Sequence, residues 1–300
     1  MAGARASLPF DLPEVDYEQY SNRQLVAVPL VVLALAIAVI GIYYVLNGVP
    51  VGLGIAFTGG TEVSVATADS QDAVRSTFDP APASVRPVLG EDTYILTFPP
   101  ESAVGGSSSA DLDRIRSQAE AAGYEIVSSS NVSPSFGGTA QRQALAGVAV
   151  AFLGMSVLVF VLFRTFVPSI AVVASAFSDI VIPVALMNLF GIDLSLGTVA
   201  ALLMLIGYSV DSDLLLNNHV LRRRGGFYES TYRAMRTGVT MTLTSIAAMT
   251  VMTIVSFLLG IPLLPEVGVV LVFGLTADLM NTYMLNVTLL RYYKFEAIGR

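Results

Sequence analysis

The chain has 300 residues, a formal net charge of −7 and only 13% charged residues. With 54% hydrophobic residues and a mean hydropathy of +0.69, this composition excludes an ordinary soluble domain and predicts a membrane protein. The lack of cysteine excludes disulfides and thiolate metal sites, and the negative charge provides no basic footprint for nucleic acid. We therefore expect no metal site, no cofactor and no nucleic-acid partner.

The chain begins with an acidic tail, residues 1–23, which we expect to lie in the cytoplasm. An uncharged stretch over 24–61 follows it. This stretch exceeds the apolar core of a signal peptide, and it is long enough for the roughly 20 residues of a spanning helix. It therefore predicts a first transmembrane helix over 24–46.

Residues 47–140 form the one long connection between spans and are predicted to be a small α+β domain. Alternating sequences predict strands over 62–67, 93–98 and 124–128, with a weaker candidate over 85–88. Helices are predicted over 71–78 and 110–122, and a Gly/Ser loop over 101–109. The order strand, helix, strand, strand, helix, strand is that of the ferredoxin-like split βαβ pattern.

This domain also carries the acidity of the chain, since its eleven acids and four arginines account for the whole net charge of −7. A surface that binds cationic partners and a solvated surface suited to high salt are both consistent with this charge, and we favour the second. Fifteen arginines against one lysine also fit a halophilic source.

Residues 141–290 are predicted to hold five further spans, followed by a cytoplasmic tail over 291–300. The spans cover roughly 143–163, 168–190, 195–218, 238–259 and 265–289. Lys and Arg occur after spans two, four and six, but not in the loops after spans three and five. The positive-inside rule therefore predicts a multi-pass protein of the cell membrane, with both termini cytoplasmic and 47–140 outside.

Three aspartates interrupt otherwise apolar spans: Asp179, Asp211 and Asp278, with Asp213 two residues beyond Asp211. A carboxylate at membrane depth is expensive, so it normally faces a bundle interior or water and often belongs to an ion pathway. From a rise of about 1.5 Å per residue, we expect Asp179, Asp211 and Asp278 to meet at similar depth. Asp213 lies about 200° further round the helix and is expected to face elsewhere.

The residues alone leave more than one interpretation of these polar groups open. Buried amides and hydroxyls can simply join helices, which we favour for Asn188, Asn286 and the threonines of the fifth span. For Asp211 we favour ion coupling, because a buried carboxylate can exchange a proton near neutrality. The single histidine, His219, is expected to be interfacial, and no nucleophile elbow accompanies it, so no enzyme is predicted.

Several motifs, taken in order, resemble those of one known family of membrane proteins. Residues 54–61 (GIAFTGGT) are similar to the family's GIDFTGGT and include Gly54, Phe57, Gly59 and Gly60. Residues 178–180 (SDI) resemble its HDV. Residues 199–209 (VAALLMLIGYS) resemble the run into the fourth span, which ends here in Gly207, Tyr208 and Ser209. Arg236-Thr237 with Thr244-Ser245 resembles the entry to the fifth span. The resemblance covers nearly the whole chain and is to the SecD/SecF family of protein-export membrane proteins, in the RND superfamily, and within it to the smaller subunit.

The resemblance implies an RND-type half of six transmembrane helices. It implies an accessory subunit that uses an ion gradient, of protons or sodium ions, with a SecD-like subunit. Together they would help unfolded preproteins leave the Sec translocation channel. Asp211 would be the coupling carboxylate, with Asp213, Arg236 and Asp278 as partners and Asp179 as a further candidate.

Two departures from the family pattern suggest an archaeal form. Ala56 replaces an aspartate, and Asp211-Ser212-Asp213 replaces Asn-Asp-Thr, which leaves the choice between Asp211 and Asp213 open. The alternatives are a proton-coupled RND-type exporter of lipids or small molecules and a membrane scaffold without coupling.

Overall fold

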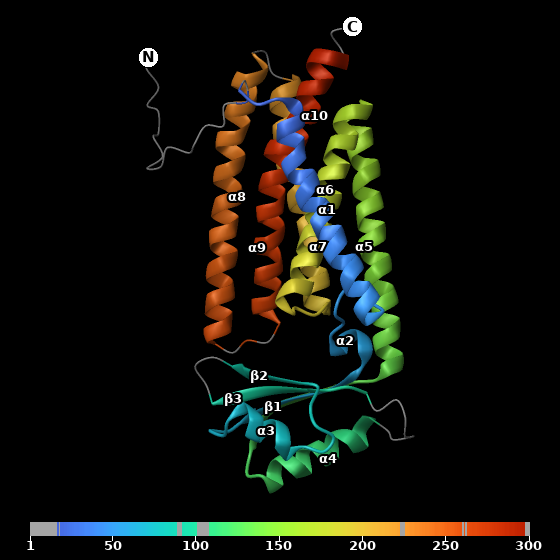
Figure 1. Ribbon diagram of the computed structural model, residues 1–300, viewed down its shortest axis with the longest axis vertical. Helices are drawn as coiled ribbons and strands as arrows, with labels where there is room; N and C mark the ends of the chain where they lie inside the picture. The colour runs from blue at the N-terminus through green and yellow to red at the C-terminus, as the bar shows by residue number, and fades with distance from the viewer. Residues whose placement is uncertain are drawn as a thin grey trace.

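The computed structural model describes residues 17, 19–88, 92–100, 108–222, 226–259, 261 and 263–297. Figure 1 shows a bundle of long helices with a small sheet and its helices at one end, which we call the sheet end. We call the opposite end, where the first helix begins and the last one finishes, the terminal end.

The described residues contain six helical segments long and apolar enough to cross a membrane, and the six predicted spans are confirmed. Five of them are single helices, and the sixth is a composite of two α-helical and two π-helical stretches. They are α1 (Asn22–Asn47), α5 (Pro134–Phe163), α6 (Phe166–Phe190), α7 (Leu196–Arg222), α8 (Phe227–Leu258) and the composite of α9 (Leu264–Met280), η1 (Asn281–Asn286), α10 (Val287–Tyr292) and η2 (Tyr293–Ala297).

Local sequence sets the ends of these helices. Ser21 and Gln24 form a capping box at the start of α1, and Gly48 ends that helix in the left-handed conformation, with φ of 76°. Ser133 accepts a hydrogen bond from the backbone N–H of Phe136 and so caps α5, whose first residue is proline.

The sheet has four strands, β1 (Gly60–Ala66), β2 (Ser84–Val88), β3 (Thr93–Phe98) and β4 (Glu125–Val132). Their order is β2-β3-β1-β4 and every pair is antiparallel. Helices α3 (Gln71–Thr77) and α4 (Ser108–Ala121) cover the face turned away from the bundle (Figure 1). This is the predicted ferredoxin-like α+β arrangement. The weak candidate strand exists because β2 lies at the sheet edge, where Pro87 is tolerated.

A short helix, α2 (Ile55–Thr58), joins α1 to β1 and packs on the start of α5. The Gly54 N–H donates to the Leu194 carbonyl at 2.9 Å, and Phe57 is buried in the apolar core. Gly59 and Gly60 adopt positive φ, and a side chain at Gly60 would meet the Phe98 carbonyl. The glycine-rich motif therefore fixes the sheet against the bundle.

A charged contact makes a second junction between sheet and bundle. Arg86 of β2 donates to Glu266 in the first turn of α9 at 2.9 Å. Burial raises the pKa of neighbouring Glu62, and the Arg86 guanidinium opposes that rise. The arginine thus offsets the acidity of this junction.

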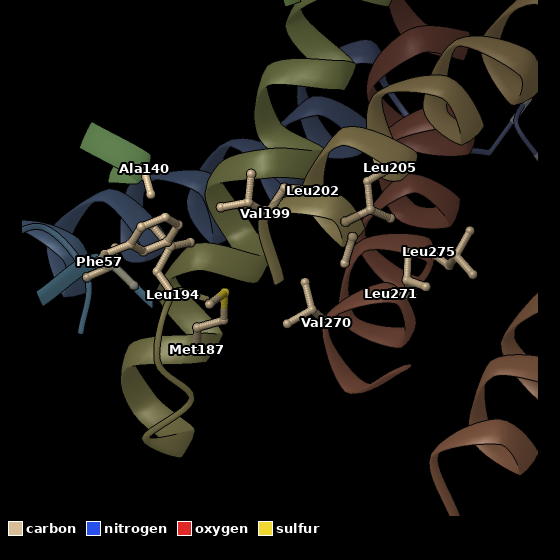
Figure 2. Close-up of a cluster of buried hydrophobic side chains, with 12 residues drawn as sticks. Phe57, Ala140, Met187, Leu194, Val199, Leu202, Leu205, Val270, Leu271 and Leu275 are labelled. Atoms are coloured by element: carbon tan, nitrogen blue, oxygen red, sulfur yellow. The ribbon is translucent and has the colours of Figure 1, made fainter. Parts of the chain in front are cut away.

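Helices α6, α7 and α9 form the centre of the bundle, whereas α1, α5 and α8 lie outside them. The most apolar window of α6 is 56% buried, against 6% for α5 and 11% for α8. At the sheet end an apolar layer joins the three central helices (Figure 2), with Val199, Leu202, Leu205, Val270, Leu271 and Leu275 at its centre. A second apolar layer, at the terminal end, contains Leu216, Val220, Tyr283, Val287 and Leu290.

Candidate functional site

Three buried aspartates lie between these two apolar layers, one on each central helix. They are Asp179 of α6, Asp213 of α7 and Asp278 of α9, each at most 2% exposed, and we call them the aspartate cluster. Along α7 and α9 the apolar residues of the sheet-end layer come before the carboxylates and those of the terminal-end layer come after. The cluster is therefore a polar layer closed by apolar side chains on both sides.

Asp179 is bonded to both of the other central helices. Its Oδ2 accepts from the Ser209 hydroxyl of α7 at 2.7 Å, and its Oδ1 accepts from the Asn281 side-chain amide of η1 at 2.6 Å. Hydrogen bonds to an ionised carboxylate are among the stronger ones in proteins. Asp179 thus ties α6 to both partners at the depth of the cluster.

Asp213 and Asp278 share one donor, the Thr282 hydroxyl, at the contact between α7 and the last span. Asp213 Oδ1 accepts from the Thr282 hydroxyl at 2.9 Å and from the Asn286 side-chain amide at 2.7 Å. Asp278 Oδ1 accepts from the Ser212 hydroxyl at 2.7 Å and lies 3.3 Å from the Thr282 hydroxyl. A change of charge on one carboxylate must therefore alter the donors available to the other.

The π-helical turn η1 supplies three of these donors: Asn281, Thr282 and Asn286. The backbone N–H of Val287 bonds to the Thr282 carbonyl, five residues back instead of four. This wider turn keeps residues 278, 282 and 286 on one face, because four-residue steps would drift round an ordinary α-helix. Such turns recur at functional sites.

The polar layer has unused hydrogen-bonding capacity. Asp213 Oδ2 and the side-chain oxygens of Asn281 and Asn286 are buried without a hydrogen-bond partner among the described residues. The hydroxyl of Ser175, one turn before Asp179 on α6, makes no hydrogen bond of ordinary geometry either, although it lies close enough to Asp179 and Asp213 to interact with both carboxylates. A buried polar atom without a partner costs free energy, so these atoms are suited to binding water or a cation, and Asp213 Oδ2 is also suited to binding a proton.

The expectation that Asp211 meets Asp179 and Asp278 inside the bundle is wrong, and so is the expectation that Asp213 faces away. Helix α7 is turned so that Ser209, Asp213 and Leu216 are buried, whereas Asp211 is exposed. Two residues separate the acids by about 200° on a helix, so only one of them can face the centre.

The other predicted site residues divide between the cluster and the surface. Gly207 lies on the exposed face of α7 with Asp211, and Tyr208 is partly buried against the sheet-end layer. Arg236 is exposed on α8, and no ion pair joins it to a carboxylate within the described ranges. The structure therefore does not bring Arg236 into the cluster.

Sequence reasoning missed the serines of the site. Ser209 was predicted as part of a motif and as a neighbour of Asp213 by helical spacing, not as a partner of Asp179, and neither Ser212 nor Ser175 was singled out. Helical spacing could have identified Ser175, because it lies four residues before Asp179 and so on the same helix face. Small hydroxyl residues are also common where membrane helices pack closely.

Comparisons with known proteins identify the family. Residues 114–296 match the model described as protein export membrane protein SecD/SecF, C-terminal. The SecF protein of Haloferax volcanii is 67% identical over 291 residues, covering 97% of this chain and 99% of the relative. That of Methanolacinia petrolearia is 42% identical, covering 93% and 96%.

The fold is also that of a solved relative. The crystal structure of SecDF from Thermus thermophilus, described as a translocon-associated membrane protein, superimposes with a TM-score of 0.71 at 20% identity. The match covers 94% of this chain but only 39% of the longer SecDF chain. By the matched model and these relatives, the chain belongs to the SecD/SecF family of protein-export membrane proteins.

Proposed function

We propose that this accessory subunit of protein export uses its aspartate cluster to couple ion movement to the export of preproteins. The observation that carries the proposal is a set of three carboxylates, each bonded across helices and enclosed by two apolar layers. Carboxylates are costly at membrane depth, and they occur there mainly where ions or protons move.

Asp213 is the coupling carboxylate in this proposal, in place of Asp211. Two donors of η1 hold its Oδ1, and its Oδ2 has no partner in the described part of the chain. Protonation converts a carboxylate from an acceptor into a group that also donates. Binding a proton at Asp213 would therefore change its bonds to Thr282 and Asn286, and with them the contact between α7 and the last span.

The test compares Asp213→Asn with Asp211→Asn in a strain depleted of the native subunit. Asp213→Asn should abolish export that depends on the ion gradient, because an amide cannot exchange a proton, while Asp211→Asn should retain it. Complex assembly, measured by size-exclusion chromatography, should be unchanged in both. Normal export by Asp213→Asn would exclude its coupling role, and loss only in Asp211→Asn would return that role to Asp211.

A SecD-like subunit is the proposed partner, and the exposed polar groups of α7 and α8 support it. Asp211 is exposed on α7 within the predicted span 195–218, where lipid offers no hydrogen bonds, and Asn218, Arg236 and Thr244 are also exposed on α7 and α8. The chain spans only about two-fifths (39%) of the solved SecDF chain, which leaves room for a second half. The translocation channel and unfolded preproteins complete the proposed set of partners.

Purification of the tagged chain from its native membrane in mild detergent tests this partner. We expect a larger SecD-like subunit in one-to-one ratio, measured by mass and peptide composition. A homo-oligomer without such a subunit, still active in vesicles, would instead favour the alternative of a proton-coupled exporter.

The proposed orientation follows from the arginines. Both termini lie in the cytoplasm, and the sheet domain lies outside the cell membrane, because Lys and Arg follow spans two, four and six.

A further inference from the structure

Tyr17 precedes the first helix, yet it is among the most deeply buried large side chains of the described residues, at 1% exposure. Its ring belongs to the apolar layer at the terminal end, with Met235 of α8 and Tyr283 of η1. A tyrosine hydroxyl in such a layer needs a hydrogen-bond partner, since an unmade bond is costly there.

The polar atoms of Tyr17 bond to three different elements. Its hydroxyl donates to the Tyr283 carbonyl of η1 at 2.9 Å, and its N–H donates to the Tyr232 hydroxyl of α8 at 3.2 Å. Its carbonyl accepts from Arg291 of α10 at 2.9 Å, and the same guanidinium group lies over the Tyr228 ring. One residue thus joins the N-terminal segment to α8, to η1 and to α10, which follows η1 in the last span.

The carbonyl that Tyr17 binds belongs to the turn that serves Asp213. Tyr283 follows Thr282 directly and precedes Asn286 by three residues, and these two donate to Asp213 Oδ1. A π-helical turn is rare and persists only where its surroundings hold it. The Tyr17 hydroxyl comes from outside the helix and donates a hydrogen bond to the backbone of this turn, at the Tyr283 carbonyl.

We propose that Tyr17 is a positioning residue for the aspartate cluster, whose hydroxyl holds η1 in the geometry that brings Thr282 and Asn286 to Asp213. The inference rests on the proposed coupling role of Asp213. The positioning role belongs to the hydroxyl of Tyr17 and the packing role to its ring, so the two roles can be tested separately.

The test is Tyr17→Phe, which keeps the ring and removes the hydroxyl, in the complex purified from its native membrane. The readout is modification of Asp213 by dicyclohexylcarbodiimide as a function of pH, followed by peptide mass spectrometry. This reagent attacks the protonated carboxyl group. The titratable groups around Asp213 are Asp179 of α6, Asp278 of α9 and Tyr283 of η1, and all of them stay in place in this variant.

We expect the midpoint of labelling to move to higher pH by about half a unit to one unit, because weakened donors stabilise the carboxylate less. Tyr20→Phe is the matched control, since Tyr20 is 47% exposed and its bond to Arg291 is made by the backbone carbonyl, which the substitution keeps. Its labelling midpoint should equal that of the wild type.

An unchanged midpoint in Tyr17→Phe, with or without a lower melting temperature, would overturn the inference, because it leaves Tyr17 a packing role only. If Tyr17→Phe does not accumulate, Tyr232→Phe takes its place, since it removes the acceptor of the Tyr17 N–H and should shift the midpoint in the same direction.

Asp213→Asn separates the two proposals. If that variant still supports gradient-driven export, the coupling role fails. If it does not, and Tyr17→Phe behaves as wild type, only the role of Tyr17 fails.

Discussion

The hydroxyl of Thr282 lies 2.9 Å from Asp213 Oδ1 and 3.3 Å from Asp278 Oδ1, within reach of two carboxylates. A hydroxyl has one proton, so it donates fully to only one of them at a time. The carboxylate that carries the charge will attract it more strongly. A single residue thus links the states of two acids on different helices.

Replacing Thr282 by valine should make Asp213 easier to protonate. The change keeps the shape of the side chain and removes the donor, which costs the ionised carboxylate about 1.5–3 kcal/mol. The carbodiimide labelling midpoint of Asp213 should rise by about one pH unit or more.

Thr276→Val is the matched control for this change. Thr276 lies on the same span, is exposed and donates to the Val272 carbonyl of its own helix. Its loss should leave the midpoint in place. Equal behaviour of the two variants would mean that the hydroxyl of Thr282 does not act on the cluster.

Among single residues, the sequence predicted that Asp179 and Asp278 lie inside the bundle, but it did not predict which of Asp211 and Asp213 does. Asp179 and Asp278 could be singled out because each stands alone in an apolar stretch. Asp211 and Asp213 stand in the same stretch, and the resemblance to known motifs shifted the acid by one residue either way. The rotation of α7 that buries Asp213 is set by packing of Leu205, Leu216 and Val220 against other helices, which local pattern does not encode.

Among the elements, the helices and strands were largely predictable, but the π-helical turn was not. Uncharged stretches indicate spans and alternation indicates strands, because each depends on local sequence. The turn η1 depends on bonds made over long sequence distances, such as those from Tyr17 and to Asp213. The order of the sheet was predictable only through the recurrence of the split βαβ pattern.

Burial is distributed unequally over the whole molecule: three helices are central, and the other three have faces without partners among the described residues. Such faces contact lipid or another subunit.

The orientation of the bundle in the membrane is also a property of the whole molecule. It can be tested with introduced cysteines because the chain has none of its own. The predicted Gly/Ser loop would suit a label, but residues 101–107 lie outside the described ranges, so α4 is the better site.

Ser117→Cys, on the exposed side of α4, should react with a membrane-impermeant maleimide in intact cells, because the sheet domain is proposed to lie outside. Tyr20→Cys, at the terminal end, should react only after permeabilisation. The opposite pattern would invert the topology, and reaction of both sites in intact cells would mean that the label had crossed the membrane.

The bond between Arg86 and Glu266 connects the sheet mechanically to the last span. Glu266 stands in the first turn of α9, and Asp278 lies on the same helix about 18 Å further on, from a rise of about 1.5 Å per residue. A continuous helix transmits axial displacement nearly as a rigid rod. A pull on β2 would therefore reach Asp278 along α9, in addition to any movement passed through the glycine-rich junction, and a shift of Asp278 along the helix axis would move β2 in return.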